Sequence, residues 1–393
     1  MTSDSGKISK STNVPTTAPE PRSLLGYHRQ LSLNAAVKVS PLCLGGMSFG
    51  TAWTNMMGSC DKEASFELLD YFYSQGGNFV DTAGNYQAGE SEQIIGEWMS
   101  ARDNRDEMVI ATKYSAPWQI IHDDKKIQSN YGGNNRKSLV VCVEASLKKL
   151  QTTYIDLLYV HIWDFTTSIP ELMHSLNYLV ASGKVLYLGV SNTPAWIVSK
   201  ANEYARQKGL TPFSVFQGQW SAAEREIERD VLPMCMDQGM ALAAFGVLGM
   251  GYFRTSAERE AEANASESRQ GRNLSFVDKP QKTIMADALE KVATARGVSI
   301  TAVALAWSRS KAPYVFPIVG GRKVEHLKEN IAALGLKLTA EEIIEIEKAV
   351  PFDFGYPQTF LGGPSGATHP GDVWSVKRLG HFEWEAAQQV KRS

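Results

Sequence analysis

Cysteine is scarce in this sequence: the 393 residues contain four, at positions 43, 60, 142 and 235, and no two form a CxxC pair. Scattered cysteines favour neither a zinc site nor a disulfide framework, and they indicate a reducing compartment, which we expect to be the cytoplasm. No run approaches the roughly 20 apolar residues of a membrane span. Basic residues form no block and the formal net charge is −2. We therefore expect neither a membrane nor a nucleic acid as a partner.

Two further signals are absent. Residues 1–24 have neither the apolar stretch nor the small-residue cleavage pattern of a signal peptide, and their polar composition predicts a disordered tail. The glycine-rich segments 45–50 and 246–251 do not have the GxGxxG spacing of a dinucleotide fingerprint. An open doubly wound sheet is disfavoured for that reason.

Short apolar runs alternate with amphipathic stretches from about residue 25 to residue 350. Asp61 can begin one helix, Ser168 and Glu171 form a capping-box pattern, and Thr193–Pro194 can begin another in the same manner. This alternation indicates a parallel sheet, and the number of runs favours a closed (β/α)8 TIM barrel. The expected strands cover residues 37–43, 78–81, 108–113, 155–160, 184–190, 213–217, 240–245 and 314–319.

Two segments depart from a minimal barrel. The polar stretch 254–278 follows the seventh expected strand and is either a flap over the barrel mouth or a solvated insertion. The tail 351–393 is rich in glycine, proline and aromatic residues, too apolar for a free linker. We expect the tail to pack on the barrel or on a second subunit, and the second arrangement would make the protein a homodimer.

The expected strands end in polar groups of different kinds. Asp81, Lys113 and His161 each follow an apolar run, and Tyr86 lies five residues beyond Asp81. In a β/α barrel, the residues at the carboxyl ends of the strands meet at one mouth. A tyrosine with an ordinary pKa of about 10 needs a nearby ammonium group to act as a proton donor, and Lys113 held by Asp81 can supply it. Each of these residues alone could be structural, but together they suit proton transfer to a carbonyl oxygen.

These segments resemble the aldo-keto reductase superfamily, most closely its fungal aryl-alcohol dehydrogenases and norsolorinic acid reductases. The resemblance rests on NFVDTAGNYQAGESE, VIATKY, IDLLYVHIWD, GVSN, VFQGQWS and PIVGGRKVEHLKEN, in the family's order between about residues 31 and 350. It implies a TIM barrel, an NADP-dependent oxidoreductase, no metal, and a catalytic tetrad of Asp81, Tyr86, Lys113 and His161. The implied cofactor-binding residues are Ser191, Asn192, Gln217, Phe245, Gly246, Val247, Leu248, Gly249, Gly320, Gly321, Arg322, Lys323, His326 and Asn330.

Several of these assignments have a plain alternative. Phe245 stands where the family usually has an aromatic residue that stacks on the nicotinamide, but it could be core packing. Arg322 and Lys323 precede a helix, where cations oppose the helix dipole, which favours an anionic ligand over free surface charges. His326 stands where many relatives have Arg or Gln, so the preference for NADPH over NADH depends mainly on Arg322 and Lys323.

Aromatic residues near the tetrad indicate the substrate. Trp53, Trp118 and Trp163 are candidate walls of a pocket for an aromatic carbonyl compound, although each could instead anchor a loop. We therefore expect NADPH-dependent reduction of aromatic aldehydes or ketones, reversible toward aryl alcohols, within fungal secondary metabolism.

Two other functions remain open at this stage. The barrel could be a cofactor-sensing regulatory subunit that retains the tetrad. A metal-dependent hydrolase using Asp81, His161 and Asp164 is disfavoured, because Lys113 would repel the ion and a third imidazole is missing.

Overall fold

A computed structural model describes residues 17–119, 127–263, 279–367 and 369–384. Eight parallel strands close into a barrel in the order β10-β3-β4-β5-β6-β7-β8-β9, so the expected fold class is confirmed. Their bounds are β3 (Cys43–Gly45), β4 (Phe79–Asp81), β5 (Val109–Tyr114), β6 (Ile155–Val160), β7 (Val185–Ser191), β8 (Val215–Gln219), β9 (Ala241–Phe245) and β10 (Val315–Val319).

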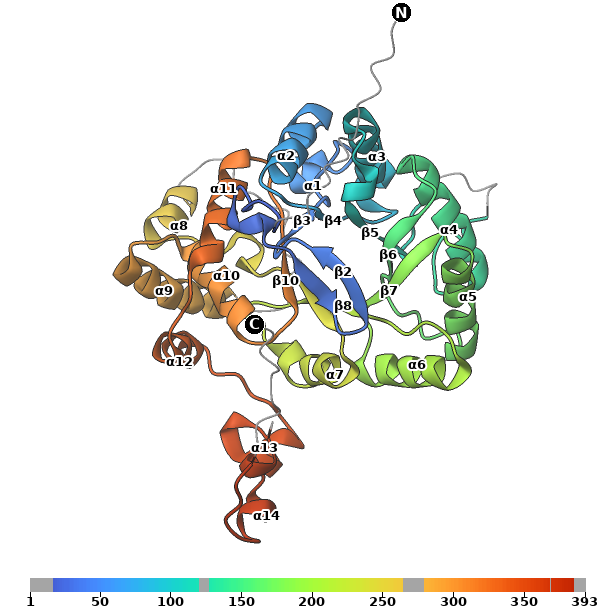
Figure 1. The fold of residues 1–393 in the computed structure, drawn as a ribbon. Helices are drawn as coiled ribbons and strands as arrows, with labels where there is room; N and C mark the ends of the chain where they lie inside the picture. Colours follow the sequence, from blue (N-terminus) through green and yellow to red (C-terminus); the bar gives the residue numbers. More distant parts are fainter. Residues whose placement is uncertain (1–16, 120–126, 264–278, 368, 385–393) are drawn as a thin grey trace, which may run out of the picture.

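The first expected strand was placed wrongly. Residues 37–43 divide between β2 (Ala35–Val39), which pairs antiparallel with β1 (Arg29–Ser32), and the barrel strand β3. Leu31 and Val39 of this hairpin pack with Phe79 and Phe316 inside the barrel. In Figure 1 the hairpin lies across the barrel opening. It therefore closes the end where the strands begin and leaves the opposite end for the site.

A ring of helices covers the barrel (Figure 1). Their apolar sides face the strands because buried residues recur at helical spacing, as Leu172, Leu176 and Leu179 do in α5. The helices that follow the strands are α1 (Thr54–Met57), α2 (Lys62–Ser74), α3 (Glu90–Arg102), α4 (Arg136–Lys149), α5 (Ile169–Ala181), α6 (Ala195–Lys208), α7 (Val231–Gln238), α8 (Ser256–Ala263), α9 (Lys279–Arg296), α10 (Ile300–Ser310), α11 (Val324–Ala332) and α12 (Ala340–Ala349).

The helix starts differ partly from expectation. Asp61 caps α2 by accepting from the N–H of Ala64, as expected. Ser168 accepts from the N–H of Glu171, but Glu171 Oε1 accepts from the N–H of Arg136, so the reciprocal half of the capping box is replaced by a contact with α4. Thr193 does not cap α6, because its hydroxyl donates to the Ser191 carbonyl instead.

The segments outside the barrel are described in part. Of the polar stretch 254–278, residues 264–278 lie outside the described residues, while Ser256 and Arg259 of α8 bond to Glu290 and Asp287 of α9. The tail beyond Val350 first contacts the segment before α7, where Arg229 donates to the carbonyls of residues 353 and 354. It then continues through α13 (Gln358–Gly362) and α14 (Trp374–Lys377) away from the barrel (Figure 1). Residues 1–16 and 385–393 of the expected tails also lie outside the described residues.

Candidate active site

A buried lysine is the centre of the site. Lys113 Nζ donates to Asp81 Oδ1 over 2.5 Å, to the Thr82 carbonyl over 2.7 Å and to Tyr86 Oη over 3.3 Å. Lys113 is 1% exposed and Asp81 is 4% exposed. The three acceptors use the three donors of the ammonium group, so the charge is buried with its hydrogen bonds satisfied.

The barrel brings these side chains together because their strands are neighbours. Asp81 ends β4, Lys113 lies in β5, and the two strands pair in parallel register. Tyr86 follows β4 in a short 3₁₀ segment (Tyr86–Gly89), where Gln87 and Ala88 adopt left-handed backbone angles, with φ of 51° and 54°. This turn directs Tyr86 back over Lys113.

His161 completes the group from the end of β6. Its ring lies edge-to-face with Tyr86, with centroids 5.9 Å apart, and its backbone N–H donates to the Tyr114 carbonyl. The Nδ1 atom of His161 is buried and has no hydrogen-bond partner. The structure thus brings all four residues of the expected tetrad to one mouth.

Burial sets the pKa values of the site together with the charged pair of Lys113 and Asp81. Burial raises the pKa of Tyr86 above its usual value, and the charge of Lys113 offsets only part of that rise. The pKa of Lys113 is also raised, because Asp81 and Tyr86 together outweigh the effect of burial. Burial, aided by Lys113, lowers the pKa of His161 to about 3. Tyr86 and His161 are therefore both neutral at physiological pH, and Lys113 is charged.

The residues expected to contact the nicotinamide lie beside the tetrad. Gln217 Nε2 donates to Asp81 Oδ2 over 2.7 Å, and its Oε1 is the atom able to accept from a carboxamide. Asn192 Nδ2 donates to the His161 carbonyl and to Ser191 Oγ. Phe245, at the end of β9, is partly buried.

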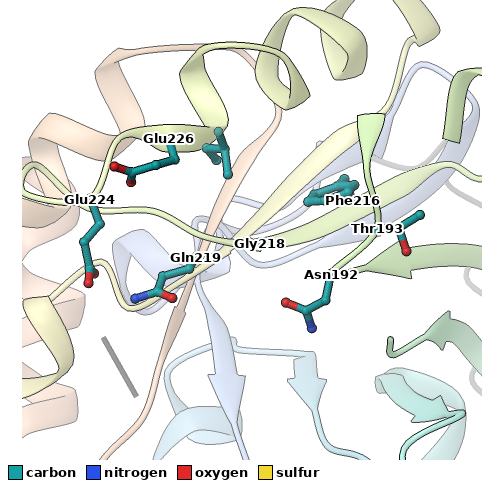
Figure 2. Close-up of a pocket in the computed structure, with 8 residues that line it drawn as sticks. Asn192, Thr193, Phe216, Gly218, Gln219, Glu224 and Glu226 are labelled. Atoms are coloured by element: carbon teal, nitrogen blue, oxygen red, sulfur yellow. The ribbon is translucent and has the colours of Figure 1, made fainter. Parts of the chain in front are cut away.

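A pocket of about 380 Å³ adjoins this group. It is lined by Asn192, Thr193, Phe216, Gly218 and Gln219, together with two glutamates and an isoleucine of the following loop (Figure 2). Figure 2 shows Asn192 and Gln219 on either side of Gly218 in β8. None of the four tetrad residues lines this pocket, and Asn192, which bonds to the His161 carbonyl, connects the two. Gln219 Nε2 is buried without a partner, which suits a bound polar group.

The turn after β9, one of the two expected to hold phosphates, contains glycines in the left-handed region. Gly246 and Gly249 adopt φ of 76° and 62°, a conformation that favours glycine. The Arg322 guanidinium lies directly against Gly58: a Cβ atom added to Gly58 would come within 1.7 Å of it. Of the other expected residues, Val247 and Asn330 are buried, Leu248 and Gly321 are half-buried, and Gly320, Lys323 and His326 are exposed.

The three candidate tryptophans have different surroundings. Trp53 lies edge-to-face with Tyr86 at 6.3 Å between ring centroids. Trp118 packs on Tyr131 and near the Lys149 ammonium, and Trp163 is 7% exposed and packs on Phe165. Among the three, Trp53 is the one whose ring contacts a tetrad residue.

Two residues that could not be identified from the sequence, Gln87 and Glu90, hold the loop that carries Trp53. Gln87 is fully buried and bonds to the loop that carries Trp53, and Glu90 bonds to the same loop. Both follow Tyr86 closely, but nothing in their spacing indicates which segment they contact.

In the described ranges, no group of three or more His, Cys, Asp or Glu side chains is placed to hold a metal ion. No helix in the described part of the chain is long and apolar enough to cross a membrane.

A β/α barrel with a tyrosine, a lysine, an aspartate and a histidine at one mouth is the architecture of an oxidoreductase acting on CH–OH groups. Residues 41–351 match the model of the aldo/keto reductase family, and the chain belongs to that family.

Curated relatives agree with this assignment. The chain is 55% identical to norsolorinic acid reductase B of Dothistroma septosporum, over 93% of this chain and 94% of the relative. It is 53% identical to an aryl-alcohol dehydrogenase of Pestalotiopsis microspora, over 96% of both chains. It is 48% identical to aryl-alcohol dehydrogenase [NADP(+)] of Phanerodontia chrysosporium, over 96% of this chain and 99% of the relative.

Proposed function

We propose that this protein is an NADPH-dependent reductase of aromatic aldehydes or ketones that also oxidises the corresponding aryl alcohols. The observation that carries the proposal is the contact of one buried ammonium group with both Asp81 and Tyr86, beside the ring of His161. The names of the relatives support the substrate class, because two of those named above are aryl-alcohol dehydrogenases and one of these is named for NADP(+).

The residues beside the tetrad fit a nicotinamide cofactor. The partnerless Gln219 Nε2 and the pocket next to Asn192 offer room and a hydrogen-bond donor. Asn192 and Gln217 would hold the carboxamide, and Arg322 and Lys323 would hold a ribose phosphate. When bound, NADPH supplies the hydride that reduces the carbonyl carbon.

The chain's own residues manage the proton. Tyr86 is protonated because its pKa is raised, so in reduction it can donate the Oη proton to the carbonyl oxygen. The resulting phenolate would be stabilised by Lys113 Nζ, which already donates to Oη over 3.3 Å. Neutral His161 keeps one ring N–H, and it would orient the same oxygen by a hydrogen bond.

A carbonyl panel assayed with NADPH and NADH in parallel tests the proposal. We expect consumption of NADPH with benzaldehyde-type substrates, a slower reaction with NADH, and formation of NADPH when aryl alcohols and NADP⁺ are supplied. If folded protein reduced short aliphatic carbonyls and no aromatic one, the proposed substrate class would be wrong. If it reduced no carbonyl with either cofactor, the proposed activity would be wrong.

A further inference from the structure

We propose that Gln87 is a positioning residue that fixes residues 47–58, here called the rim loop, so that Trp53 forms a wall of the substrate site. The proposal rests on the proposed function for the identity of the substrate. The contacts that carry it are made by the segment between Tyr86 and α3 and do not depend on which substrate is bound.

Gln87 joins the rim loop to the catalytic turn through both ends of its amide. Its Oε1 accepts from the backbone N–H of Trp53 over 2.7 Å, and its Nε2 donates to the Met47 carbonyl over 3.1 Å. The side chain is 0% exposed. Because both partners are backbone groups, the contact fixes the path of the loop and not only one side chain.

The backbone of Gln87 is held in an uncommon conformation. Its φ and ψ are 51° and 41°, and Ala88 follows with 54° and 27°. Such angles cost free energy in residues other than glycine and persist only where the surroundings enforce them. The rim loop also rests on Gln87, because a Cβ at Gly50 would lie 2.8 Å from Gln87 Cβ. The turn after Tyr86 and the rim loop are therefore fitted to each other.

Other contacts hold the remainder of the rim loop. Glu90 Oε2 accepts from the backbone N–H groups of Thr51 and Ala52 over 2.6 and 3.3 Å. At the other side, Ser48 Oγ donates to the Gly321 carbonyl over 3.2 Å. The loop thus extends from the Tyr86 turn to the turn after β10, and Gln87, which directly follows Tyr86 in the chain, bonds to it at Met47 and Trp53.

The position of Trp53 makes this contact relevant to substrate selection. Its ring lies at 70° to the ring of Tyr86, and His161 lies edge-to-face with Tyr86 as well. Trp53 and His161 therefore both pack against the proton donor. A planar substrate that approaches Tyr86 would meet the Trp53 ring, whereas a short aliphatic aldehyde has little surface to place against it. Loss of the Gln87 contact should therefore affect the two substrates unequally.

The test compares Gln87→Gly with Gln93→Ala. Glycine suits the left-handed backbone at position 87, so this variant removes the amide without adding strain. Gln93 is a matched control because it lies on α3, is exposed, and donates to Glu97 over 2.9 Å. We expect Gln87→Gly to raise KM for an aromatic aldehyde about ten-fold, the effect of one or two lost hydrogen bonds, and to raise KM for propanal much less. Gln93→Ala should change neither.

A double-mutant cycle with Trp53→Ala shows whether Gln87 acts through Trp53. In the Trp53→Ala background, Gln87→Gly should add little further change in KM for the aromatic substrate. Additive effects would overturn the proposal. An equal loss of kcat for both substrates, with KM unchanged, would also overturn it, since Gln87 would then act on the Tyr86 turn alone.

Amide hydrogen exchange gives a readout that does not depend on turnover. The N–H of Trp53 should exchange at least about ten-fold faster in Gln87→Gly than in the parent and in Gln93→Ala. Unchanged protection would show that Gln87 does not hold the rim loop. If the parent reduced no aromatic carbonyl, the proposed function would fail, while the exchange result would still decide whether Gln87 fixes Trp53.

Discussion

Replacement of Lys113 by methionine is the perturbation that most clearly separates stability from catalysis. The variant keeps an unbranched side chain of similar length but removes the ammonium group that contacts Asp81, Thr82 and Tyr86. Asp81, which is 4% exposed, still accepts a hydrogen bond from Gln217 but loses its counter-ion. Removing one partner of a buried ion pair costs about 3–5 kcal/mol, so we expect unfolding by urea at a correspondingly lower concentration.

The double variant Lys113→Met with Asp81→Asn is the matched control. It leaves no uncompensated buried charge, so it should recover about 1–3 kcal/mol of the lost stability. Carbonyl reduction should nevertheless remain at least about 100-fold below the parent in both variants, because neither has a group that stabilises the Tyr86 phenolate.

The loss of Lys113 should also change how aryl-alcohol oxidation depends on pH. Lys113 lowers the pKa of Tyr86 against the larger effect of burial, so its removal should raise that pKa further. Oxidation of an aryl alcohol requires the deprotonated phenol, and its rate should therefore increase only at higher pH in the variant than in the parent. A double variant with parental turnover, or an unshifted pH profile in Lys113→Met, would refute this account of Lys113.

Three further predictions concern other parts of the chain. The pKa of His161 is about 3 in the folded protein and about 6.5 when unfolded. Between pH 7.5 and 5 the parent should therefore lose about 2 kcal/mol of stability in urea unfolding, a loss that His161→Asn should not show. The same dependence of unfolding free energy on pH in both proteins would contradict this. Gly58→Ala should displace Arg322 and weaken NADPH binding about ten-fold in a fluorescence titration, whereas Gly183→Ala, at a similar φ with open space, should not. Arg229 bonds to the carbonyls at 353 and 354, so Arg229→Ala should speed proteolysis of the tail without changing turnover; an unchanged cleavage rate would contradict the tether.

The sequence was sufficient to predict the barrel and the meeting of the tetrad. Buried parallel strands read as continuous apolar runs, and Asp81, Lys113 and His161 stand where such runs end, so topology alone brings them to one mouth. The first strand was misplaced because the apolar residues of the hairpin strand β2 also enter the barrel, which makes its pattern similar to that of a barrel strand.

Contacts between distant loops could not be predicted. Glu171 has capping-box spacing, yet it bonds to the start of α4, a residue 35 positions away. Gln87 contacts Trp53 and Met47 only because the strained turn after Tyr86 aims its amide at the rim loop. The net direction of the Tyr86 pKa also depends on burial, which the sequence does not contain.

The central claim is that the Tyr86 hydroxyl donates the proton during carbonyl reduction, and Tyr86→Phe tests it most directly. Reduction of an aromatic aldehyde with NADPH should fall by about 100-fold or more in this variant, while NADPH binding measured by fluorescence titration should stay at the parental level. Turnover at the parental rate would contradict the claim.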